Sequence, residues 1–87
     1  MTIDPFYSGF YQGVNRISRD VHRFIGDAYW FASSKKADGF ESRLKAAEDV
    51  LKDFVVHARG KYQSRIRSLE EDIDRCRAVG MGALARR

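Results

Sequence analysis

The sequence contains only one cysteine and one proline in 87 residues. A single cysteine excludes an internal disulfide, and the sequence has no Cys/His cluster typical of a structural metal site. A single core in so short a chain rarely supplies more than about 3–5 kcal/mol, so small folds usually need a disulfide, a metal or a partner. The composition therefore favours self-association or partner binding. The lone cysteine also fits a reducing compartment, and we expect a cytoplasmic protein.

Long apolar runs are also missing. The longest uncharged stretch is 5–15, which includes Ser, Gly, Gln and Asn and is too short and polar to span a bilayer. The beginning of the sequence has no basic segment followed by an apolar one, so we expect neither a targeting segment nor a membrane span. The net charge of +4 is modest. It permits an acidic partner but does not by itself indicate nucleic acid binding.

Aromatic residues are concentrated near the start, where eight of the eleven fall between positions 6 and 31. Many belong to an apolar stripe with alternating steps of four and three residues, which predicts a helix over 4–33. Asp4 followed by Pro5 is a favourable helix start. The stripe consists of Ile3, Tyr7, Phe10, Val14, Ile17, Val21, Phe24, Ala28 and Phe31. Further apolar residues lie beside the stripe, so one partner helix cannot cover them all.

A second apolar stripe runs from Phe40 to Cys76 with an average step of 3.6 residues, the period of a straight helix. It predicts a connector over 33–38 and a helix over 39–79, with Asp38 at the head of a capping box. Two steps of four follow each other around Gly60, so we expect the helix to bend or loosen there. The glycines at 80 and 82 predict that 80–87 is a frayed tail.

Together these patterns predict an all-α fold, namely an antiparallel two-helix hairpin in a single domain over 1–87. A short connector forces adjacent helices to be antiparallel. The second helix would then extend past the first, and its apolar residues 73–79 would have nothing in this chain to meet. We therefore expect self-association into a dimer or a larger helical bundle.

Catalytic chemistry has little support, because no nucleophile has a base and an orienting group near it. We predict no catalytic, cofactor-binding or metal-binding residues and no cofactor. Cys76 lies between two arginines that would favour its thiolate, yet packing is the preferred interpretation. The acidic run 70–74 is interpreted as a solvated face, with a docking patch for a basic partner as the alternative.

A candidate binding face combines the uncharged aromatic segment 5–15 with the basic stretch 59–67, which the hairpin would place side by side. Aromatic surface rimmed by arginine is typical of protein interfaces. The predicted partner-binding residues are Phe6, Tyr7, Phe10, Tyr11, Tyr29, Trp30, Arg59, Lys61, Arg65 and Arg67. We expect a non-enzymatic helical interaction protein, a small adaptor, chaperone-like partner or inhibitor, that binds itself and another protein. The alternative is a nucleic-acid-binding hairpin using the same basic stretch.

Overall fold

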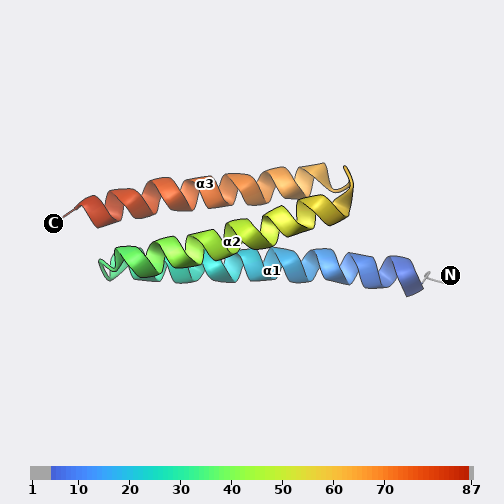
Figure 1. Ribbon diagram of the computed structural model, residues 1–87, viewed down its shortest axis with the longest axis horizontal. Helices are drawn as coiled ribbons and strands as arrows, with labels where there is room; N and C mark the ends of the chain where they lie inside the picture. The colour runs from blue at the N-terminus through green and yellow to red at the C-terminus, as the bar shows by residue number, and fades with distance from the viewer. Residues whose placement is uncertain (1–4, 87) are drawn as a thin grey trace.

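The computed structural model describes residues 5–86, with side chains from residue 13 onward. This part of the chain is all-helical and contains three helices, α1 (Pro5–Ser33), α2 (Ala37–Ala58) and α3 (Gln63–Ala85). Figure 1 shows them as a long antiparallel bundle in which α1 and α3 run in the same direction and α2 runs against both. Each helix packs against the other two.

The predicted hairpin of two helices is therefore wrong, because the expected helix over 39–79 is interrupted after Ala58. Arg59, Gly60 and Tyr62 all have positive φ values, of 52°, 83° and 61°. This left-handed backbone ends α2 and turns the chain back. The interruption falls where the sequence predicted only a bend, and it creates α3.

The reversal also removes the expected apolar overhang over 73–79. In α3, Leu69, Ile73 and Cys76 are all buried in the core, and only Val79 remains exposed. The core joins all three helices, and its members are Val14, Val21, Ile25, Ala28, Ala32, Phe40, Leu44, Ala47, Leu51, Phe54, Ala58, Leu69, Ile73 and Cys76. The bundle therefore covers within one chain what the hairpin would have left for a partner.

Helix α1 buries a wider face than its heptad stripe predicted. Ile25 lies beside the stripe and is buried, whereas the stripe residues Phe24 and Phe31 are only half-buried. The reason is that α1 packs against two helices at once, so its apolar contact surface spans more than one seam.

The segment 80–87, predicted as a frayed tail, is helical as far as Ala85. Gly80 is buried, and a Cβ atom built on it would collide with the ring of Phe40 at the start of α2. The missing side chain thus lets α2 and α3 approach each other closely. Nearby, the Lys35 ammonium donates to the backbone oxygens of Ala83 and Arg86.

The α1–α2 connector is shorter than predicted, because Ser33 still belongs to α1 and α2 begins at Ala37. The residue at the N-cap is Lys36, which makes no side-chain capping hydrogen bond. Asp38 therefore does not head a capping box. It lies in the first turn of α2, where a carboxylate interacts favourably with the helix dipole.

Candidate functional site

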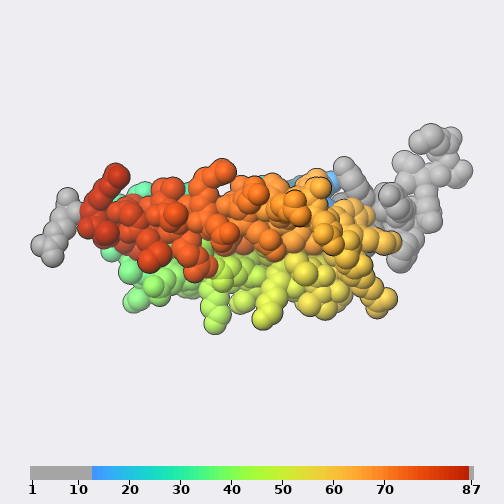
Figure 2. All heavy atoms as spheres, turned by 90° about the horizontal axis from the view of Figure 1, so that it is seen from above, coloured from blue at the N-terminus to red at the C-terminus, as the bar shows by residue number. Residues whose placement is uncertain are grey.

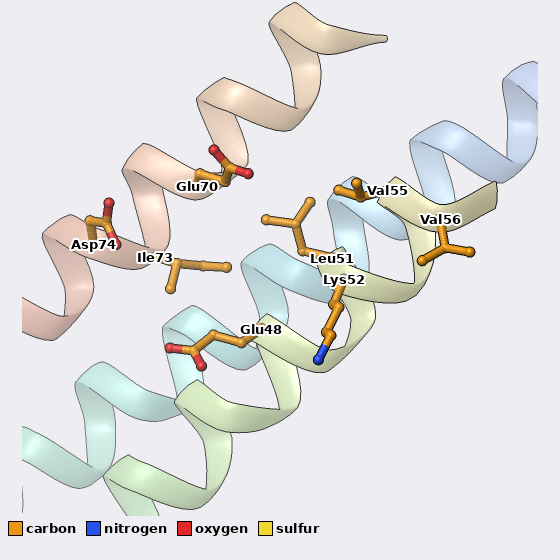
Figure 3. A pocket seen from close by; sticks show the side chains of 8 residues that line it. All are labelled: Glu48, Leu51, Lys52, Val55, Val56, Glu70, Ile73 and Asp74. Atoms are coloured by element: carbon orange, nitrogen blue, oxygen red, sulfur yellow. The ribbon is translucent and has the colours of Figure 1, made fainter. Parts of the chain in front are cut away.

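A groove with a volume of about 510 Å³ lies between α2 and α3. Figure 3 shows Leu51 of α2 and Ile73 of α3 pointing toward each other across it. Val55 and Val56 continue the apolar lining along α2, and they are exposed to 40% and 69%. The groove therefore presents aliphatic side chains to solvent along the middle of the bundle.

Charged side chains line the rest of this groove. Glu48 and Lys52 come from α2, and Glu70 and Asp74 come from α3 (Figure 3). Glu48 also forms an ion pair with Arg77, which links the two helices. Because Arg77 already neutralises Glu48, the excess negative charge of the lining comes from Glu70 and Asp74 against Lys52, and it favours a basic ligand.

A second hollow of about 260 Å³ shares Val55 and Glu70 with the groove and continues toward the α2–α3 connector. Gly60, Ile66 and Arg67 line it. The two hollows thus follow the same pair of helices. Figure 2 shows this pair in space-filling form, with α3 in orange and red lying along α2 in green and yellow.

The four predicted basic residues occupy the α2–α3 connector and the beginning of α3, and all are exposed. Arg65 nevertheless uses its Nη1 to donate a hydrogen bond of 2.9 Å to Ser18 Oγ of α1. This bond satisfies a buried hydroxyl, so Arg65 contributes to packing α3 on α1. Arg59, Lys61 and Arg67 have no ion-pair partner among the described side chains.

The first turns of α1 lie at the same end of the bundle as the basic residues and extend beyond the connector (Figure 1). The side chains of Phe6, Tyr7, Phe10 and Tyr11 lie outside the described ones. Their predicted pairing with the basic stretch therefore stays a prediction.

Tyr29 and Trp30 lie near the opposite end of the bundle, close to the α1–α2 connector (Figure 1). The structure does not bring them together with the basic residues, so the ten predicted residues do not form one continuous surface. Trp30 is 60% exposed, and the Lys36 ammonium lies 5.7 Å from the centroid of its ring. Tyr29 is half-buried and packs against the core.

Cys76 is fully buried under α1, where its thiol lies 3.8 Å from the backbone oxygen of Ile25. Burial raises the pKa of this thiol, although a side-chain hydrogen bond with Tyr29 acts in the opposite direction. The neighbouring arginines that the sequence suggested as thiolate stabilisers are exposed instead. Burial likewise raises the pKa of Tyr29, and the charge of Cys76 contributes in the same direction.

The acidic side chains of the run 70–74 lie in different surroundings. Asp72 accepts a hydrogen bond of 2.9 Å from His22 on α1, whereas Glu70 and Asp74 line the groove. His57 is exposed and contacts the backbone oxygen of Asp53. The two histidines therefore serve separate contacts.

The groove was missed by sequence reasoning, because it exists only once α3 folds back along α2. The available signal was the pair Val55 and Val56, two adjacent valines that lie off the apolar stripe.

Among the described residues, no group of three or more His, Cys, Asp or Glu could hold a metal ion. Within residues 5–86, no helix is both long and apolar enough to cross a membrane. Comparison with protein-family models, curated proteins and solved structures finds no match for this chain.

Proposed function

We propose that this chain is a non-enzymatic interaction protein, a small adaptor, chaperone-like partner or inhibitor, that self-associates and binds another protein. The observation that carries the proposal is the open groove between α2 and α3. Its floor is apolar and its edges are charged, as in protein-binding surfaces that combine an aliphatic centre with a polar rim.

A partner that covers the groove would gain free energy by burying its exposed valines. Complete burial of a valine side chain contributes about 1.5–3 kcal/mol. Val55 and Val56 are already partly covered, so a partner that buries the remainder would gain on the order of 1 kcal/mol from each. Leu51 and Ile73 are already buried at the floor, so they shape the groove and add little further area.

The shape and charge of the groove favour an amphipathic helix as the ligand. A helix laid between α2 and α3 would place apolar residues at positions i, i+3, i+4 and i+7 over the aliphatic floor. Lysines or arginines on its flanks would meet the carboxylates of Glu70 and Asp74. Such charge complementarity mainly sets specificity and the association rate.

A peptide titration tests this proposal. The probe is a fluorescent helical peptide with leucines at i, i+3, i+4 and i+7 and lysines on both flanks, measured by fluorescence anisotropy. We expect Val56→Asp to weaken its binding at least about tenfold, because a carboxylate would replace an apolar contact. Val79→Asp is the matched control, since Val79 is also an exposed helical valine but does not line the groove. Equal affinity for the two variants, or no binding to the unmodified protein, would overturn the groove as the binding site.

The aromatic and basic end of the bundle is proposed as a second contact surface. Arg59, Lys61 and Arg67 would orient the partner, and the aromatic residues 6–11 would anchor it. Their exposure without an acidic partner also supports the alternative function, binding of nucleic acid.

Salt dependence separates these two possibilities. Nucleic acid binding through several cationic contacts weakens steeply with salt. We expect no appreciable binding to generic single- or double-stranded oligonucleotides at about 150 mM salt. Retention at this salt concentration that is lost when Arg59, Lys61 and Arg67 are all changed to Glu would favour the nucleic acid alternative.

A further inference from the structure

The α2–α3 connector is a strained hinge. Arg59 and Tyr62 have left-handed backbone conformations in which the Cβ atom crowds the following carbonyl, and Gly60 lies between them at a φ of 83°. The α1–α2 connector has one such residue, Lys35, whose side chain is tied to the end of α3 by two hydrogen bonds. At the hinge itself, the ring of Tyr62 packs against Phe54 of α2, with the ring centroids 6.2 Å apart.

The apolar stripe continues through this hinge in steps of three or four residues. The buried or half-buried residues at this point of the chain are Phe54, Ala58, Tyr62, Ile66, Leu69 and Ile73. Successive members are separated by four, four, four, three and four positions. A continuous helix over 37–85 would therefore keep all of them on one face, so the same sequence supports a straight connector.

The beginning of α1 provides a surface for the straight form. The first turns of α1 extend past the connector (Figure 1). In the bundle α2 ends and turns away before reaching them. If α2 continued straight, residues 59–67 would run beside this segment, which the sequence fills with uncharged and aromatic residues.

We propose that two copies of this chain exchange α3. In the exchanged dimer the connector 59–62 straightens, α2 and α3 form one helix, and each α3 packs against α1 and α2 of the other copy. The contacts that hold α3 within one chain then form between chains. They include the burial of Leu69, Ile73 and Cys76, the Arg65–Ser18 and His22–Asp72 hydrogen bonds, and the Arg77–Glu48 ion pair.

The exchange keeps these contacts and releases the left-handed backbone of the hinge. Strained hinges of this kind favour domain swapping. The exchanged dimer regains the contacts of the closed chain, so its main cost is the entropy lost when two chains associate. The proposal rests on the self-association included in the proposed function and specifies how the second copy is engaged.

Two substitutions in the hinge move the equilibrium in opposite directions. Gly60→Ala disfavours the closed connector, where φ is positive, and favours the continuous helix. We expect it to lower the dissociation constant of the dimer by at least about 100-fold, since both chains contribute. Arg59→Gly relieves the closed connector and weakens the straight helix, so it should raise that constant. Gly26→Ala is the matched control, because Gly26 is exposed in α1 and a Cβ atom there meets nothing within 4 Å.

Sedimentation equilibrium of the full chain and its three variants, over a micromolar to millimolar range, measures these constants. Far-UV circular dichroism verifies that each variant is helical. The expected order of dimer stability is Gly60→Ala above the unmodified protein and above Arg59→Gly, with Gly26→Ala equal to the unmodified protein. The reverse order, or an equal response to Gly60→Ala and Gly26→Ala, would overturn the proposal.

A distance measurement identifies the exchange itself. Lys52 and Glu70 line the same groove in the closed chain, where packed helix axes are about 8–10 Å apart. In a continuous helix they are 18 residues apart, or about 27 Å. Spin labels at Lys52→Cys and Glu70→Cys, in a Cys76→Ala background and diluted with unlabelled chain, report this distance within one chain.

A dimer that shows the long distance supports the exchange. A dimer that keeps the short distance overturns the exchange and leaves self-association standing. A protein that stays monomeric with the short distance, even as Gly60→Ala, overturns both.

Discussion

Gly80 is the position at which a single methyl group best tests how α3 ends. A Cβ atom at this buried site would collide with the ring of Phe40, whereas a Cβ atom at Gly82, two positions later in the same helix, meets nothing within 4 Å. The perturbation is therefore the same change, glycine to alanine, at one packed position and one open position. Only the contact with α2 distinguishes them.

The magnitude follows from two opposing effects. Alanine stabilises a helix interior by up to about 1 kcal/mol relative to glycine, and both variants receive this contribution. Overpacking a tight contact costs about 1–3 kcal/mol, and only Gly80→Ala bears that cost. Gly82→Ala should therefore raise the free energy of unfolding by up to about 1 kcal/mol. Gly80→Ala should lower it by about 0–2 kcal/mol.

The assay is urea unfolding followed by circular dichroism, with all proteins at the same concentration because self-association contributes to stability. The two variants should differ by about 1–3 kcal/mol, and each kcal/mol corresponds to about 4–8 °C in melting temperature for a domain of this size. A Gly80→Ala variant as stable as Gly82→Ala would refute the reasoning. It would mean that residues 80–85 do not pack against α2, as the frayed tail predicted from the sequence would require.

Three further predictions concern single side chains. Leu69→Ala should cost about 2–5 kcal/mol in urea unfolding, because Leu69 is 1% exposed; a cost below about 0.5 kcal/mol would contradict its burial in the bundle. Trp30→Ser should change the free energy of unfolding by less than about 1 kcal/mol, since the indole is mostly exposed and its main polar contact is the Lys36 ammonium; a larger loss would show that Trp30 belongs to the core. Burial raises the pKa of the Cys76 thiol in the folded state, so the folded state holds this proton more tightly than the unfolded chain does. Its stabilisation should be fully present below about pH 8.5 and be lost as pH rises further, so unfolding measured between pH 7 and 10 should show a smaller decline in Cys76→Ala than in the unmodified protein.

The site was predictable only in part. The exposed arginines and lysine at 59–67 follow from composition, since charged side chains remain in water unless paired. The separation of Trp30 from them does not follow, because it depends on where each helix ends along the bundle. The groove could not be derived at all from local patterns, because its two walls are 14 to 26 positions apart in sequence and meet only after the chain reverses.

The helical nature of the chain is determined by the sequence alone. The first stripe repeats every three to four residues from Ile3 to Phe31, and the second does so from Phe40 to Cys76. Such spacing favours an amphipathic helix, because it places the apolar residues on one face. Gly60 and the local slip in the second stripe also marked the position where the helix is interrupted.

Whether the chain bends or reverses at that position was decided by tertiary structure. A straight helix keeps its backbone hydrogen bonds and avoids the positive φ of Arg59 and Tyr62, but it exposes the apolar face of residues 69–76 when the chain is alone. The reversed chain accepts that strain because α1 and α2 together offer a cleft in which Leu69, Ile73 and Cys76 are buried. Both arrangements have the same local periodicity, so the free energy of packing α3 on the other two helices decides between them by outweighing the strain of the connector.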